Sequence, residues 1–226
     1  MAFVRQPQTF PDVLLRRSTS EGDRGDDIIL GIELKGWYLI AKEGEPSFRF
    51  QVTPKACAPQ DLIVVVPWAL SNVIAGEPKV FSPYIESAKY AAEYRNYHWT
   101  TLRQTTSPRG IDSPSDVKPY PAKSDRIADV PQSDAGGNFG RYARTGLMDN
   151  YLELTRSQLL CGIKADHWLR FFKIFQELKE PDQIRQEIDG LRAKVSAEDR
   201  APDAQTEAVI GILNHLQAIL DARGDQ

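Results

Sequence analysis

The apolar run LIVVVPW, residues Leu62–Trp68, constrains the fold of this 226-residue chain more than any other segment. A continuous β-branched run of this kind is typical of a central strand that is covered on both faces. Proline cannot donate to a strand ladder, so Pro67 is expected to mark the end of the strand. The uncharged stretch extends only to Gly76, which is too short to span a bilayer, and no membrane association is expected.

Strand patterns dominate the first part of the chain and helical patterns dominate the rest, which predicts an α/β protein. The aromatic residues Tyr90, Tyr94 and Tyr97 have helical spacing and are expected to face the core. Pro181 is expected to end the helix before it. The further expected strands are 12–17, 28–41 and 48–53, and the expected helices are 83–99, 147–160, 165–178, 184–195 and 209–219.

Residues 100–146 form a long polar segment with five prolines and five glycines and without clear periodicity. A loop of that length is either functional or disordered, or it serves as a structural linker. We therefore predict a core domain over residues 1–180 that includes this loop. A helical tail over residues 181–226, acidic and amphipathic, is expected to act as an oligomerisation or partner-binding element.

The charge and cysteine content exclude several classes of protein. The net charge of −3 gives no support to a generally basic nucleic-acid coat protein, although a local basic cleft is compatible with it. Cys57 and Cys161 are too far apart for a zinc ribbon or a disulfide framework, and the N-terminus lacks a secretion signal. We expect a reduced, cytoplasmic protein. No phosphate-binding glycine loop, serine-hydrolase elbow or zinc-protease motif is present.

The triplet Glu33-Leu34-Lys35 lies inside an apolar strand pattern and is the sharpest chemical signal. Side chains alternate along a strand, so Glu33 and Lys35 point to the same face, about 6–7 Å apart. Two charges in a buried run are costly unless they are paired, coordinated or solvated. The triplet alone also fits an ordinary charged strand face that borders solvent.

Asp12 adds a second carboxylate to this triplet. If 12–17 and 28–41 form an antiparallel hairpin centred near Gly22 and Asp23, residues whose numbers sum to about 45 lie opposite each other. Asp12 then lies opposite Glu33, within about 5 Å, which is close enough to share a hard divalent cation. Two carboxylates that hold Mg²⁺ beside a lysine ammonium form a set suited to hydrolysing phosphodiesters.

Pro11-Asp12, followed after 20 residues by Glu33-Leu34-Lys35 on an apolar strand, resembles the PD-(D/E)XK nuclease superfamily, particularly type II restriction endonucleases. The resemblance implies a central mixed β-sheet flanked by helices, with Asp12 and Glu33 as metal ligands and Lys35 as the catalytic lysine. It also implies Mg²⁺, or Mn²⁺ in its place, and cleavage of double-stranded DNA by a homodimer. A restriction enzyme would have a cognate DNA methyltransferase as a partner.

The basic and polar residues expected to contact DNA come from the strand 48–53, the helix 83–99 and the long loop. Each also has a structural explanation, as part of a solvated strand face or of a linker. They are Arg49, Gln51, Arg95, Arg103 and Arg109.

Two alternatives to a nuclease remain open from the sequence. Family members have a helix and a first strand before the Pro-Asp position, whereas ten residues precede Pro11 here. The chain could therefore be an N-terminally truncated, inactive fragment. It could also be a non-catalytic interaction protein that keeps the nuclease fold.

Overall fold

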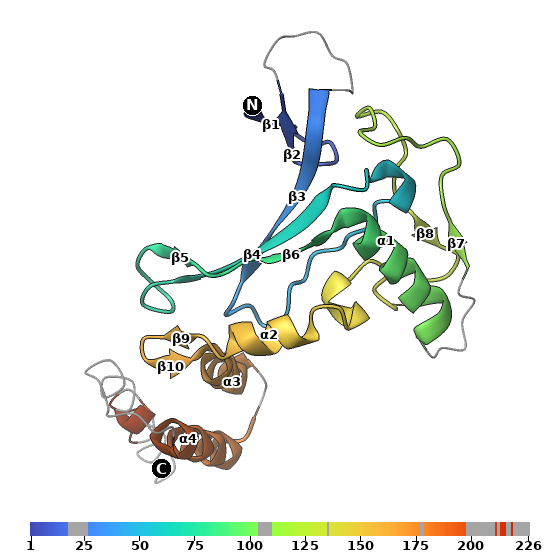
Figure 1. The fold of residues 1–226 in the computed structure, drawn as a ribbon. Helices are drawn as coiled ribbons and strands as arrows, with labels where there is room; N and C mark the ends of the chain where they lie inside the picture. Colours follow the sequence, from blue (N-terminus) through green and yellow to red (C-terminus); the bar gives the residue numbers. More distant parts are fainter. Residues whose placement is uncertain are drawn as a thin grey trace. The chain divides into compact units, whose positions relative to one another are not determined.

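The computed structural model describes residues 1–17, 27–103, 110–134, 136–176, 179–197, 211, 213–215 and 218. The fold is mixed α/β, with one central sheet and several helices (Figure 1). The chain divides into two compact units. The first contains Met1–Trp37, Pro46–Val66 and Ser82–Asn150, and the second contains Tyr38–Glu45, Pro67–Phe81 and Tyr151–Gln226. Among the described residues, no helix combines the length and the apolar composition that a membrane crossing needs.

The central sheet has six strands in the order β1-β2-β3-β4-β5, and β6 also pairs with β4. The strands are β1 (Ala2–Arg5), β2 (Val13–Arg16), β3 (Ile28–Tyr38), β4 (Leu62–Leu70), β5 (Pro78–Val80) and β6 (Tyr84–Ser87). Some of the residues before Pro11 therefore form a strand of their own, β1, which pairs antiparallel with β2.

The pairing of β2 with β3 confirms the predicted hairpin register. The strands are antiparallel, with Val13 opposite Ile32 and Leu14 opposite Gly31. The same register, carried one residue further, places Asp12 opposite Glu33.

β4 is the central strand that the sequence predicts, but it does not end at Pro67. Its alternate residues are fully buried and the others half-buried, so neither face is open to solvent. The strand continues through Pro67 to Leu70 because its partner changes there. Residues 62–65 pair with β6 and residues 68–70 pair with β5, so Pro67, which has no N–H, lies between the two ladders.

The helix expected over 83–99 is shorter, and its buried face is not the predicted one. Its first part forms strand β6, and α1 (Ala88–Tyr97) begins at Ser87, whose side chain accepts a hydrogen bond from the Tyr90 N–H. The prediction that the three tyrosines face the core is wrong. Tyr90 and Tyr97 are 45% and 50% exposed. The core face of α1 consists of Ala88, Ala91, Ala92 and Arg95.

The segment 48–53 is extended, as predicted, but it is not a strand of the central sheet. It pairs instead with two parts of the long loop. Arg49 bridges to Arg141, and Val52 bridges to Ala128. Within the described part of 100–146, the regular elements are the two-residue strands β7 (Ile111–Asp112) and β8 (Val130–Pro131), the end of a π-helical turn (His98–Leu102) and the 3-10 turn Tyr142–Thr145.

Helices make up most of the described part of the second unit. α2 (Asp149–Arg156) is followed by the short hairpin of β9 (Leu159–Leu160) and β10 (Ile163–Lys164), then by α3 (Ala165–Gln176) and α4 (Pro181–Ala197). The Trp168 indole of α3 donates to the Leu160 carbonyl at 2.9 Å, and α3 packs against α4. Pro181 is the first residue of α4, where its missing N–H has no helical partner to lose. The second tail helix, 209–219, lies largely outside the described residues.

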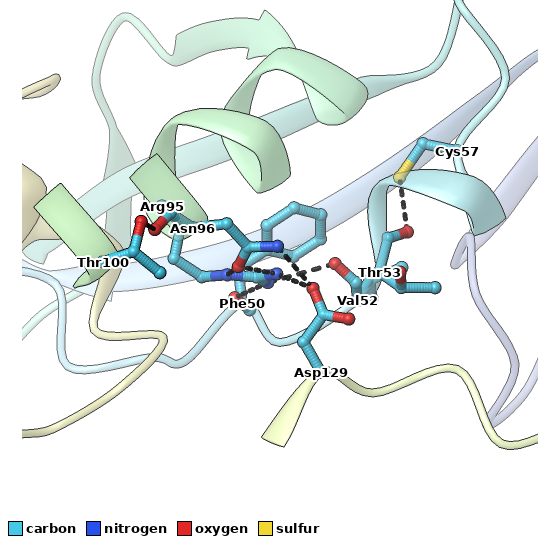
Figure 2. A network of polar contacts seen from close by, with 8 residues as sticks. All are labelled: Phe50, Val52, Thr53, Cys57, Arg95, Asn96, Thr100 and Asp129. Carbon is cyan, nitrogen blue, oxygen red and sulfur yellow. Dashed lines mark hydrogen bonds and ion pairs between the residues drawn. The ribbon is translucent and has the colours of Figure 1, made fainter. Parts of the chain in front are cut away.

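A buried ion pair between Arg95 of α1 and Asp129 joins three segments of the first unit (Figure 2). The Arg95 guanidinium lies 2.5 Å from Asp129 Oδ2 and also donates to the Phe50 and Val52 carbonyls at 2.6 and 3.0 Å. Asn96 donates to the same carboxylate oxygen at 2.8 Å. Burial lowers the pKa of Arg95 to about 10, with the Asp129 charge opposing that fall, so the guanidinium stays charged at neutral pH.

Substituting Asp129→Asn should lower the free energy of unfolding by about 3 to 5 kcal/mol. Such a loss is expected when one member of a buried pair is removed and the other charge stays in the core. Guanidinium denaturation followed by circular dichroism measures it. Asp116→Asn is the matched control because Asp116 is exposed. A difference below about 1 kcal/mol between the two variants would contradict this role for the pair.

Candidate functional site

The register of β2 and β3 brings Asp12 against the Glu33-Leu34-Lys35 triplet. Asp12 Oδ2 accepts a hydrogen bond from the Leu34 N–H at 2.8 Å. Lys35 Nζ lies 2.5 Å from Glu33 Oε1, which confirms that the two side chains share one face of β3. Asp12, which directly precedes β2, thus lies beside two residues of β3 that follow it by 21 and 23 positions.

Gly31 and Asp61 explain why Asp12 sits at this point. A Cβ on Gly31 would lie 2.4 Å from Pro11 Cγ, so only glycine lets Pro11 pack on β3. The fully buried Asp61 carboxylate accepts from the Gly31 N–H at 2.7 Å, and also from Ala58 N–H and the Tyr120 hydroxyl. Pro11 packing therefore fixes the backbone that leads directly into Asp12.

Asp12 and Glu33 line a depression that we call the carboxylate hollow. Lys123, from the long loop, also lines it and donates to Gln8 Oε1 at 2.9 Å. The hollow therefore has a lysine of its own, in addition to Lys35, which pairs with Glu33 but is not a lining residue. Its full lining is Gln8, Thr9, Phe10, Asp12, Glu33, Val52, Ala122, Lys123, Asp125 and Ile127.

The electrostatics of Glu33 mark this hollow as a place that favours added positive charge. Burial raises the pKa of Glu33 above its ordinary value, and the nearby Asp12 carboxylate raises it further. Lys35 acts in the opposite direction without cancelling the rise. A cation that approaches two such carboxylates would favour their ionised forms.

The donor set fits a magnesium ion. Mg²⁺ is usually held by one or two carboxylates, and waters and substrate phosphate oxygens complete its coordination. Asp12 and Glu33 provide two such carboxylates at one hollow. Within the described residues, no group of three or more His, Cys, Asp or Glu side chains is arranged to hold a metal. This donor set therefore differs from an all-protein zinc or calcium cage.

Arg49 and Gln51 do not line the carboxylate hollow; Val52 is the residue of their segment that does. The Arg49 guanidinium lies 3.5 Å from Asp134 Oδ2 and donates to the Phe139 carbonyl at 3.4 Å. Gln51 packs closely enough to Gly140 that a Cβ there would lie 2.7 Å from Gln51 Cγ. Both residues connect the 48–53 segment to the loop that precedes α2.

Arg95 is 2% exposed, and its guanidinium contacts Asp129 and backbone carbonyls inside the unit. It is therefore placed to hold the fold rather than to reach DNA. The Arg103 guanidinium lies over the Trp99 ring, 4.2 Å from its centroid, and lines a different depression that is described below. Arg109 lies outside the described residues.

Three residues of the site region were not singled out from the sequence. Lys123 is one of many basic residues in the long loop, and nothing in its spacing marks it. Asp61 and Asp129 are buried acids whose partners are 30 and 34 positions away. A signal that could have found them is an acid inside or beside an apolar segment, since such acids are rarely buried without a partner.

Comparison of the chain with protein-family models, with curated proteins and with solved structures found no match. The function is therefore argued from the residues and their geometry.

Cys57 should resist alkylation in the native protein. It is buried, and burial raises the pKa of its thiol to about 12, with the Asp61 charge adding to the rise. At pH 8 roughly one thiol in ten thousand would then be the reactive thiolate. Iodoacetamide at pH 8, followed by peptide mass spectrometry, should label the partly exposed Cys161 and leave Cys57 unmodified until denaturant is added. Equal labelling of both in the native state would refute a structural Cys57.

Proposed function

We propose that this chain is a Mg²⁺-dependent DNA endonuclease of the restriction type, with Asp12 and Glu33 as metal ligands and Lys35 as the catalytic lysine. The observation that carries the proposal is the antiparallel register that sets Asp12 against Glu33-Leu34-Lys35, with Asp12 and Glu33 lining one hollow. The proposal includes a restriction-endonuclease-like fold, a homodimer acting on double-stranded DNA in the cytoplasm, and Mn²⁺ as a substitute for Mg²⁺. A cognate DNA methyltransferase would be its partner.

The chemistry assigns separate tasks to the side chains at the hollow. Mg²⁺, when bound by Asp12 and Glu33, would neutralise phosphodiester charge and lower the pKa of a bound water. The Leu34 N–H holds the Asp12 carboxylate in place. The Lys35 ammonium stabilises the negative charge that develops on the phosphorus oxygens in the transition state, or orients the attacking water. Lys123 adds a second ammonium at the hollow that can counter phosphate charge.

Wild-type protein should cut supercoiled plasmid with Mg²⁺ and not with EDTA. Asp12→Asn, Glu33→Gln and Lys35→Ala should each reduce the rate by about 10²-fold or more, the cost of removing one contact that stabilises transition-state charge. Glu43→Gln and Lys42→Ala are matched controls because both residues are exposed and outside the hollow. Gel electrophoresis of plasmid and of methylated and unmethylated genomic DNA measures the outcome.

Two results would reject the nuclease. One is the absence of cutting by folded wild-type protein with either Mg²⁺ or Mn²⁺. The other is cutting that all three site variants retain, since it would come from a contaminant. Discrete genomic fragments would support sequence-specific cleavage, and a smear would argue against the restriction type.

One observation favours the alternative of a non-catalytic interaction protein. Lys35 and Glu33 form an ion pair within the chain, so each charge has a partner without any metal. This alternative expects no heat of Mg²⁺ or Mn²⁺ binding in calorimetry, and expects Lys35→Ala to leave biological activity intact. Metal binding that Glu33→Gln abolishes would exclude it.

A further inference from the structure

A second depression of the first unit is lined by several cationic side chains. It shares no lining residue with the carboxylate hollow. We call it the arginine hollow. It lies between the end of α1 with the turn after it, which contribute His98, Trp99 and Arg103, and the 136–145 segment, which contributes Gly137, Arg141 and Arg144. The hollow holds about 250 Å³, which is room for a phosphate group and a few waters.

The charged side chains of this lining are arginines: Arg95, Arg103, Arg141 and Arg144. Among the described residues that line the hollow there is no aspartate or glutamate. Two nearby acids are already paired, one of them with Arg95, a buried residue of this lining. Asp134 pairs with Arg49 and accepts from the Phe139 N–H at 3.0 Å, while Asp129 pairs with the buried Arg95. The arginine hollow is thus complementary to an anion.

Arg103 is held in a fixed position at this hollow. Its guanidinium lies on the Trp99 ring on one side, at 4.2 Å from the centroid. On another side it lies against Gly137, where a Cβ would be 2.1 Å from Arg103 Nη1. A guanidinium that is already ordered loses less conformational entropy when it binds a phosphate, and its planar fork matches two phosphate oxygens.

Trp99 contributes a buried indole to the lining. The residue is 6% exposed, and its indole Nε1 has no hydrogen-bond partner among the described residues. The Nε1 atom has almost no accessible surface, so the indole contributes to the hollow the ring on which Arg103 lies, and not a hydrogen bond to a ligand. Burial and the nearby Arg103 charge lower the pKa of His98, which leaves a neutral imidazole at the hollow at pH 7.

The exposed face of α1 favours a nucleic-acid strand as the carrier of this anion. The rings of Tyr90, Tyr94 and Tyr97 form a ladder, with centroids 6.0 and 6.2 Å apart, and two of the three are about half exposed. Unpaired bases stack on exposed aromatic rings, whereas inorganic phosphate makes no use of them. The ladder and the hollow belong to the same helix and the turn that follows it.

We infer that the arginine hollow binds a backbone phosphate of the DNA strand, through Arg103 and Arg144, at a site separate from the carboxylate pair. The choice of DNA rests on the proposed nuclease function. Binding is measured in EDTA, where no cutting is expected, so a failure of this inference and a failure of the nuclease proposal give different results.

The test is fluorescence anisotropy, over a series of salt concentrations, of a labelled single-stranded DNA and of the same sequence as a duplex. The double variant Arg103→Gln/Arg144→Gln should weaken binding by 10-fold or more. It should also lower the slope of log K against log salt by about 2, one for each lost phosphate contact. The control Lys42→Gln/Lys118→Gln removes the same charge from two exposed positions outside the hollow and should leave both quantities nearly unchanged.

Gly137→Ala tests the same site without changing the net charge. Its added methyl would displace the Arg103 guanidinium, so binding should weaken several-fold while circular dichroism stays that of wild type. If the double variant does not fold, this variant decides the question. Unchanged affinity in the folded variants overturns the inference.

Competition distinguishes a strand from a free phosphate. Inorganic phosphate and a mononucleotide should displace the duplex only at concentrations far above the duplex Kd. If wild type binds inorganic phosphate more tightly than the duplex, and the double variant loses only that binding, the hollow is a small-anion site and the strand assignment is wrong.

Discussion

The buried contact between Arg95 and Asp129 is the interaction on which the first unit depends. The guanidinium reaches from α1 to two carbonyls of the 48–53 segment and to a carboxylate of the long loop. An uncompensated charge in this position would cost several kcal/mol, so α1, the extended segment and the loop are stable only together. The neighbouring backbone bonds from Asp129 to Gln51 and from Thr53 to Ile127 extend the same attachment on either side of Val52.

A second set of contacts fixes the position of Asp12 in the carboxylate hollow. The buried Asp61 carboxylate binds the Gly31 N–H, and the missing side chain of Gly31 leaves room for Pro11. Asp12 therefore follows a residue whose position is set by packing rather than by the loop around it. This is how a carboxylate at the start of a four-residue strand is held against β3 closely enough to accept the Leu34 N–H. Backbone contacts therefore set the position of the Asp12 carboxylate relative to the side chains of Glu33 and Lys35.

Sequence reasoning succeeded where local rules decide the structure and failed where distant partners do. The β2–β3 register followed from strand periodicity and turn position, because a one-residue slip would turn every side chain to the wrong face. The tyrosines of α1 show the opposite case. Their spacing fits a helix face, but Ala88, Ala91 and Ala92 let the helix approach its neighbours closely, and the rings remain outside. Arg95 takes the core face only because Asp129, 34 residues away, neutralises it. Neither helical periodicity nor composition reports such a partner.

The long loop connects the Arg95–Asp129 ion pair to both the carboxylate hollow and the arginine hollow. Residues 122–127 line the carboxylate hollow and residues 136–145 line the arginine hollow, and Asp129 lies between them in sequence. A polar segment of this length gains little from apolar burial, so it needs ionic and backbone contacts to hold a fixed course. The buried ion pair provides such contacts at Asp129, which lies in sequence between the residues that line the two hollows. The proposed nuclease would need acidic groups where a metal acts and basic groups where the strand is held, and it would have to keep the two from neutralising each other. Fastening a single loop between them at Asp129 satisfies that requirement, because the acids at one hollow and the arginines at the other are then held in separate places on the same unit.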